Sequence, residues 1–266
     1  MKVIIFCVNY NSYDELNAYL ESLRDAVKDC KMELTVIVAD NSKIIEELRS
    51  GYDFELIHIN TNGNLGYFGG AIYGIQNCGK KLSGFDYIII SNVDLQVDKE
   101  FFHQLSCLQT TESIGCIAPR IFSIGENRDR NPKVLERYSL RKLKVLRLMY
   151  KFPVLDYLYR TIFFTKRRQH VENSTQEYIY AAHGSFMLFT KQFSGFLQTM
   201  KYPVFMFGEE VFIAENLIRN GLKTIYKPEL KVWDNDHAST SKMKNSFYYK
   251  CNYEAIDMLV KEYFHE

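Results

Sequence analysis

A short apolar strand runs directly into a carboxylate near position 90. Residues 87–94 read YIIISNVD, so that Asp94 follows an uncharged, β-branched run with Asn92 just before it. A single carboxylate at a strand end, with neighbouring oxygen groups, suits Mg²⁺ or Mn²⁺, which keep several waters and bind substrate phosphates. The alternative is a turn in which Asn92 and Asp94 only cap the following helix.

Two adjacent carboxylates begin a predicted helix in the second half of the chain. Glu209 and Glu210 stand in the segment FMFGEEVFIAENLIRNG, residues 205–221. Adjacent residues on a helix point roughly 100° apart, so that one can face a cleft as a general base while the other binds a cation or caps the helix. The alternative is a favourable interaction of both acids with the helix dipole.

Two further segments concentrate polar or glycine residues. The segment WDNDHAST, residues 233–240, contains His237, which is able to complete a metal site with Asp94 and a diphosphate; a solvated loop is the alternative. The segment GNLGYFGG, residues 63–70, follows a predicted strand and begins a helix, where backbone amides can face a phosphate. It has neither the Gly-Lys-Ser/Thr of a P-loop nor a regular GxGxxG, and a tight turn explains it equally well.

The elements that position these groups alternate between strand and helix in the first half. Strands are predicted at 2–8, 34–39, 54–59, 87–91 and 114–118, and helices at 12–28, 68–80 and 98–109; Ser12 and Glu15 are spaced as a capping box for the first helix. Strand–helix–strand units at this spacing indicate an α/β fold with a mostly parallel sheet.

Each predicted parallel strand loses its apolar character at its carboxyl end. In open α/β sheets ligands bind in the crevice at that edge. We therefore expect Asn9, Asp40, Asn41, Asn64 and Asp94 to converge there, although they are far apart in the sequence.

The second half has a different pattern. Residues 133–168 are predicted to form a basic helical insertion, followed by short strand-like runs on either side of 183–185. A helix is expected over 209–220, short strands at 222–226 and 230–233, and a closing helix over 246–264. We divide the chain into a first half (1–122), the helical insertion (123–176) and a second half with the last helix (177–266).

Composition is that of an ordinary globular protein. The 266 residues are 47% hydrophobic and 24% charged, and no apolar run approaches the roughly 20 residues of a membrane helix. The amino-terminal apolar run becomes polar too quickly for a signal peptide. Six cysteines occur without a CxxC pair, which favours six core residues in a reducing cytosol over a zinc site. We expect a cytoplasmic protein.

The net charge of +1 conceals one strongly basic segment. Residues 133–168 contain eleven Lys and Arg and two acids, a local charge of +9. On a single helical wheel Lys133, Arg137 and Lys144 fall on one side and apolar residues largely opposite, as in an interfacial amphipathic helix. We expect 133–168 to dock on the inner face of the cell membrane or on a lipid-diphosphate acceptor; the alternative is packing on its own domain or on a second subunit as a homodimer.

Six short motifs, taken in order, resemble one family. They are Val8-Asn9-Tyr10-Asn11, Val38-Ala39-Asp40-Asn41-Ser42, Asn64-Leu65-Gly66-Tyr67-Phe68-Gly69-Gly70, Asn92-Val93-Asp94, Phe205-Met206-Phe207-Gly208-Glu209-Glu210 and His237-Ala238-Ser239-Thr240. The set resembles inverting nucleotide-sugar glycosyltransferases of the GT-A fold, in particular the rhamnosyltransferase-like branch of glycosyltransferase family 2. Glu210 stands where this family usually has Asp, and Val93 replaces its common Pro.

The resemblance implies a role for each site residue. The residues implied to bind the donor, a UDP or dTDP sugar such as dTDP-rhamnose, are Asn9, Asp40, Asn41, Asn64, Gly66, Asn92 and Asp94. His183, Gly184 and Glu209 would lie on the acceptor side. Asp94 and His237 would bind Mn²⁺ or Mg²⁺, and Glu210 would act as the base. The implied reaction is direct displacement with inversion onto a glycan or lipid-linked acceptor, in bacterial surface polysaccharide synthesis.

Three other classes of protein were weighed. A sugar nucleotidyltransferase usually has a Gly-rich, basic loop after the first strand, whereas this chain has Asn9-Tyr10-Asn11-Ser12 there. A catalytically silent partner subunit of the same fold stays open because of Glu210 and Val93. A nucleic-acid binder is disfavoured, since the remainder of the chain carries a charge of −8 and few aromatics alternate with the basic run.

Overall fold

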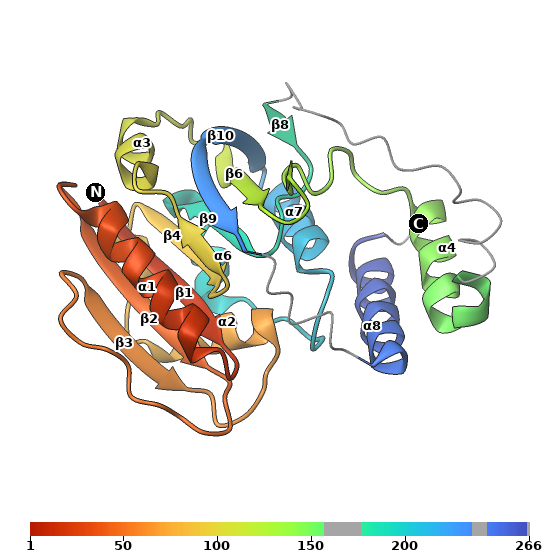
Figure 1. Cartoon of the computed structure of the whole chain (residues 1–266). Helices are drawn as coiled ribbons and strands as arrows, with labels where there is room; N and C mark the ends of the chain where they lie inside the picture. The colour runs from red at the N-terminus through yellow and green to blue at the C-terminus, as the bar shows by residue number, and fades with distance from the viewer. Residues whose placement is uncertain (157–176, 236–243, 265–266) are drawn as a thin grey trace.

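A mixed sheet organises the molecule, which is described by a computed structural model over residues 1–156, 177–235 and 244–264. The strand order is β3-β2-β1-β4-β9-β6-β10-β5, with β7 beside β6 and β8 beside β10 (Figure 1). The strands are β1 Lys2–Asn9, β2 Glu33–Asp40, β3 Glu55–Asn60, β4 Tyr87–Asn92, β5 Leu95–Val97, β6 Ile114–Ser123, β7 Arg128–Asp129, β8 Tyr178–Ile179, β9 Phe186–Thr190 and β10 Lys223–Asp234.

Helices cover both faces of this sheet. They are α1 Tyr13–Val27, α2 Tyr67–Asn77, α3 Phe101–Cys107, α4 Leu140–Lys151, α6 Ser194–Thr199, α7 Glu209–Arg219 and α8 Asn245–Tyr263, with short 3₁₀ turns at Leu82–Gly84 and Lys191–Phe193. The side chains of β1 alternate: Val3, Ile5 and Cys7 join the core that includes α1 and α3, whereas Ile4 and Phe6 face the core that includes α2 and α7. Two hydrophobic layers therefore hold the sheet in place.

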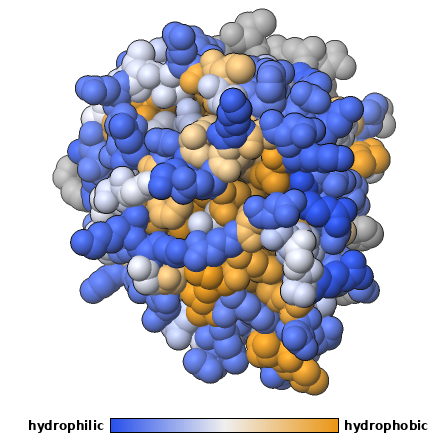
Figure 2. All heavy atoms as spheres, turned by 90° about the vertical axis from the view of Figure 1, so that its left-hand side faces the viewer, coloured by the Kyte–Doolittle hydropathy of each residue, from blue (hydrophilic) through white to orange (hydrophobic). Residues whose placement is uncertain are grey.

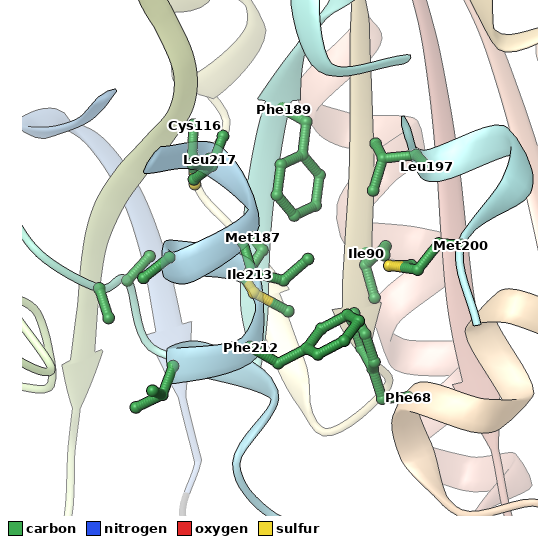
Figure 3. Packing of buried hydrophobic residues seen from close by; sticks show 14 of the residues in the cluster. Phe68, Ile90, Cys116, Met187, Phe189, Leu197, Met200, Phe212, Ile213 and Leu217 are labelled. Carbon is green, nitrogen blue, oxygen red and sulfur yellow. The ribbon is translucent and has the colours of Figure 1, made fainter. Parts of the chain in front are cut away.

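The second of these cores joins the two halves of the chain. Phe68 of α2 lies 6.3 Å, centroid to centroid, from Phe212 of α7, and Met187 and Phe189 of β9 pack beneath (Figure 3). Burying large aromatic side chains contributes about 2–3 kcal/mol each, so this contact fixes α7 relative to α2.

The edge of the sheet at β3 is more open than its centre. Every residue of β3 from Leu56 to Ile59 is half-buried, in contrast to the fully buried middle of β1. The space-filling view of this side shows apolar residues gathered among hydrophilic ones (Figure 2).

Several sequence predictions need correction. The sheet is parallel from β3 through β4, but β9 runs antiparallel to both β4 and β6, and the short β5, which was not predicted, runs antiparallel to β10. The two strands expected at 222–226 and 230–233 form one strand, β10, with an irregularity between Lys227 and Lys231. The capping box is not formed, because the amide of Ser12 donates to Oδ1 of Asn9 instead of to Glu15.

The basic insertion does not begin as a helix. Val134 forms an antiparallel bridge with Ala181, so the chain is extended there, and α4 starts only at Leu140. Lys133 and Arg137 therefore do not lie on the helical face that the wheel predicted. They form ion pairs within the protein instead, Lys133 with Glu210 and Arg137 with Glu215.

Candidate active site

The ends of the parallel strands meet as the sequence predicted. Asn9 is in register with Asp40, Asp40 with Asn60, and Val8 with Asn92. Parallel strands place their carboxyl ends at one edge, and the polar residues of four strands therefore share that edge.

A cavity of about 400 Å³ opens at this edge. Five of the predicted donor residues line it, namely Asn41, Asn64, Gly66, Asn92 and Asp94. Its wall also contains residues that the sequence analysis did not select: Tyr10, Ser12, Glu15, Tyr67, Phe205, Met206 and Phe247. Four of these residues lie within the motifs quoted above: Tyr10, Tyr67, Phe205 and Met206. Their place in those motifs is the only sequence feature that connects them to the site.

Asn9 and Asp40 lie beneath the cavity and not in its lining. The Asp40 carboxylate is fully buried and accepts hydrogen bonds from the Tyr13 hydroxyl at 2.6 Å, from His58 Nε2 at 2.8 Å and from the Ser42 amide at 2.9 Å. Burial raises the pKa of Asp40, but the hydrogen bonds from His58, Ser42 and Tyr13 outweigh it and hold that pKa well below its usual range. Asp40 is thus an ionised anchor for the residues around the cavity.

The glycine-rich loop is held against Asn41 and Phe205, which also line the cavity. Asn41 Nδ2 donates to the carbonyl of Gly66 at 2.9 Å, and the Gly66 amide donates to Asn64 Oδ1 at 2.9 Å. Gly66 has φ = +75°, and a Cβ built on it would lie 2.0 Å from the carbonyl oxygen of Phe205. Only glycine allows this close approach, which brings residue 205 to the cavity.

Asp94 carries an unusual charge environment. Burial, reinforced by the negative charge of Asp234, raises the pKa of Asp94 to about 6. Arg130 forms an ion pair with Asp234 (Nε–Oδ2 3.2 Å) and opposes this shift. Excess negative charge at a cavity wall is an environment that a divalent cation would stabilise.

The side chains around Asp94 determine how well such a cation fits the cavity. Among 1–156, 177–235 and 244–264, no cluster of three or more His, Cys, Asp or Glu side chains is arranged to hold a metal ion. Asp94 offers one carboxylate, and the other ligands of such a cation would come from a bound diphosphate and water, as is usual for Mg²⁺ and Mn²⁺. His237, the second predicted ligand, lies outside the described residues.

Glu209 and Glu210 begin α7 after a left-handed turn. Phe207 and Gly208 have φ of +67° and +85°, and the carbonyl of Phe207 accepts a hydrogen bond from the Tyr202 hydroxyl. A non-glycine residue held at positive φ costs roughly 1–3 kcal/mol, which is typical of functional sites.

The two acids have different surroundings. Burial, reinforced by the charge of Glu210, raises the pKa of Glu209 to about 8, and its carboxyl group packs against Gly184, where a Cβ would lie 2.9 Å from Oε1. Glu210 instead lies 3.6 Å from Lys133 Nζ. Glu209 is thus mainly protonated at neutral pH, and Glu210 is the acid that contacts a cation.

His183 lies on the same side as these acids. Its Nδ1 accepts from the Ser185 amide at 3.2 Å, which places the ring proton on Nε2. Burial, followed by the positive charges of Lys133, Arg130 and Arg128, lowers the pKa of His183 well below its usual value. His183 is therefore a neutral side chain able to donate a hydrogen bond.

Tyr67 connects the two groups of predicted residues. It lines the cavity beside Asp94, and its hydroxyl donates to the carbonyl of Gly184 at 2.7 Å. Burial raises the pKa of Tyr67 well above its usual value, and the charges of Glu209, Asp94 and Glu210 all reinforce the shift. Asp94 and the adjacent acids Glu209 and Glu210, more than a hundred residues further along the chain, thus all lie close enough to Tyr67 for their charges to raise its pKa.

Known structures share this architecture. The chain aligns over its full length with S. aureus TarS 1–349 in complex with UDP-GlcNAc (TM-score 0.59, 10% identity, 68% of that chain). It aligns over 98% of its length with GalNAc-T7 with UDP, GalNAc and Mn²⁺ (TM-score 0.57, 13% identity, 49% of that chain). These likenesses establish the predicted α/β architecture as the GT-A fold.

The sequence itself assigns the family. The profile described as "Glycosyl transferase family 2" matches residues 3–180, more than half of the chain, and the protein belongs to that family. A curated relative, the low-salt glycan biosynthesis hexosyltransferase Agl10 of Haloferax volcanii, is 28% identical over 120 residues. That alignment covers 45% of this chain and 36% of Agl10, so the chain matches only about a third of that relative's length.

Proposed function

We propose that this protein transfers a sugar from a nucleoside-diphosphate donor to a hydroxyl of a glycan or lipid-linked acceptor, with inversion. The observation that carries the proposal is the arrangement around Tyr67, where the cavity with Asp94 meets the acidic start of α7. The likeness to TarS and GalNAc-T7, whose structures contain UDP-GlcNAc or UDP with Mn²⁺, supports a nucleotide-sugar donor.

The donor occupies the cavity in this proposal. The exposed ring of Tyr10 and the amides of Asn41 and Asn64 surround the nucleoside, which we assign to the uracil or thymine class. Asp94 would hold Mn²⁺ or Mg²⁺ together with the diphosphate, and the bound cation would supply positive charge to stabilise the leaving group. Asp40 and Asn9 act from beneath by holding the backbone of the cavity floor.

The acceptor approaches from the side of α7. Glu210 removes the proton of the attacking hydroxyl, and Glu209, protonated at neutral pH, donates a hydrogen bond that orients the acceptor together with the Nε2–H of His183. Glu210 in place of Asp extends the base by one methylene and leaves its chemistry unchanged. The branch we favour is rhamnosyltransferase-like, with dTDP-rhamnose or a UDP-hexose as donor and bacterial surface polysaccharide as the product.

Binding measurements test the donor assignment. In calorimetry with UDP-, dTDP- and GDP-sugars, with and without Mn²⁺, we expect one pyrimidine nucleotide sugar to bind with an affinity that Mn²⁺ increases. Asp94→Asn removes the increase, whereas Asp53→Asn, an exposed acid elsewhere, retains it. Equal affinity with and without Mn²⁺, or an unchanged Mn²⁺ effect in Asp94→Asn, contradicts the proposal.

A further inference from the structure

The outer face of α4 takes no part in the glycosyl transfer proposed above. Helix α4 lies at one end of the molecule and packs on α8 (Figure 1). Leu143 is buried, Tyr150 packs on the rings of Tyr248 and Tyr249 at 6.2 and 5.9 Å, and Arg147 forms an ion pair with Asp257 at 3.1 Å. These contacts fix which side of α4 faces outward.

The outward side is apolar along its middle. Val145, Leu148 and Phe152 are 55%, 50% and 48% exposed, and their spacing of three and four residues places them on one face. Val154 and Leu155 continue the surface with 68% and 40% exposure. Five of the thirteen large apolar side chains that are exposed in the described part of the chain therefore fall within these eleven residues.

Cations border this apolar stripe. Helix α4 contains five Lys and Arg residues and no acid, and all but Arg147 are exposed: Arg141, Lys142, Lys144 and Lys151. At 100° per residue, Arg141 lies on the stripe, Lys144 and Lys151 border one side and Lys142 borders the other. Long basic side chains place their stems along apolar surface and keep their charged ends in water.

This arrangement matches one kind of partner. An apolar stripe bordered by lysines fits a bilayer surface, where the apolar residues enter the acyl boundary and the lysines meet anionic headgroups. A second copy of the chain in a two-fold contact would bring the same cations face to face. No helix within the described residues is both long and apolar enough to cross a membrane.

We propose that the outer face of α4 docks this protein on a membrane containing anionic phospholipid. The proposal does not depend on the glycosyl-transfer assignment. Each cation held near an anionic surface strengthens binding by about fivefold, so that the lysines together give a preference of about a hundredfold for anionic over neutral vesicles.

Vesicle sedimentation of the full chain tests the proposal. We expect the protein to sediment with vesicles of phosphatidylcholine and phosphatidylglycerol, less with added salt, and weakly with phosphatidylcholine alone. The triple variant Val145→Ser/Leu148→Ser/Phe152→Ser, which keeps every charge, loses at least tenfold in binding. Its matched control is Ile44→Ser/Ile124→Ser, which removes exposed apolar side chains elsewhere and keeps wild-type binding.

A charge-reversed variant tests the electrostatic half separately. Lys142→Glu/Lys144→Glu/Lys151→Glu is expected to abolish the preference for anionic vesicles, whereas reversal of the exposed lysines 31, 81 and 99 retains most of it. Thermal melting of every variant verifies folding. The proposal is overturned if the wild-type protein does not bind anionic vesicles, or if both α4 variants bind them as well as wild type does. It is also overturned if the apolar variant changes only the oligomeric mass in solution.

Discussion

The ion pair between Arg137 and Glu215 provides the sharpest test of how the segment before α4 is joined to α7. Glu215 lies on α7, its side chain is only 5% exposed, and it receives Arg137 Nε at 2.7 Å and a second guanidinium nitrogen at 2.8 Å. The Tyr180 hydroxyl donates to the same carboxylate at 2.6 Å. Arg137→Met leaves this buried carboxylate with Tyr180 and without its cation.

The magnitude follows from burial. Removing one partner of a buried ion pair costs about 3–5 kcal/mol, because the remaining charge is uncompensated. Half of the Arg137 side chain is exposed and Tyr180 remains as a donor, so we expect the free energy of unfolding to fall by about 2–3 kcal/mol. In a chain of this size that corresponds to a fall in melting temperature of about 5–10 °C.

Thermal and urea denaturation measure this effect against two comparisons. Arg24→Met breaks an exposed pair with Glu21 and is expected to cost under about 1 kcal/mol. Adding Glu215→Gln to Arg137→Met removes the stranded charge and recovers about half of the loss. If Arg137→Met is no more destabilising than Arg24→Met, or if Glu215→Gln rescues nothing, the segment before α4 is not anchored to α7 as described.

Two further predictions concern the loops and acids of the site. Gly66→Ala places a side chain on a left-handed backbone and against the Phe205 carbonyl, so we expect it to lower the free energy of unfolding by about 2–4 kcal/mol. Gly84 has open space around it, and Gly84→Ala is expected to be nearly neutral in the same melting assay. Equal melting temperatures of the two variants would contradict the loop geometry. The pKa of Glu209 is raised from 4.5 to about 8, so between these pH values the carboxyl group keeps its proton in the folded chain and loses it in the unfolded chain. The contribution of Glu209 to the free energy of unfolding therefore falls as pH rises from about 4.5 to about 8. Glu209→Gln is expected to remove that slope in urea titrations at a series of pH values, and a slope identical to wild type would refute the burial of this carboxyl group.

Much of the fold could be predicted from the sequence, because the apolar runs that predict strands are the same residues that the sheet buries. The runs that became β1, β2 and β4 are mostly apolar, as is typical of strands buried on both faces, and each ends in a polar residue. The short β5 was missed because its three residues carry no periodicity, and its pairing with β10 joins segments over a hundred residues apart.

The sequence predicted which edge of the sheet the candidate residues share, and their roles at that edge stay predictions. The strand ends predicted that Asn41, Asn64 and Asp94 share one edge, and the family resemblance added Asn92. All four line one cavity. The buried position of Asp40 depends on Tyr13 and His58, which no local pattern connects to it. The helical wheel was wrong at Lys133 because an isolated bridge between Val134 and Ala181 holds that segment extended. A long-range contact of this kind is not visible in local periodicity.

The central claim is that Glu210 acts on an acceptor beside a donor held at Asp94. The most direct measurement is release of nucleoside diphosphate from the donor sugar with saturating donor, Mn²⁺ and acceptor, comparing wild type with Glu210→Gln. The account predicts that Glu210→Gln lowers turnover by at least about a hundredfold, with unchanged donor affinity, because it removes only the base. Wild-type turnover in Glu210→Gln, or loss of donor binding in step with turnover, would contradict it.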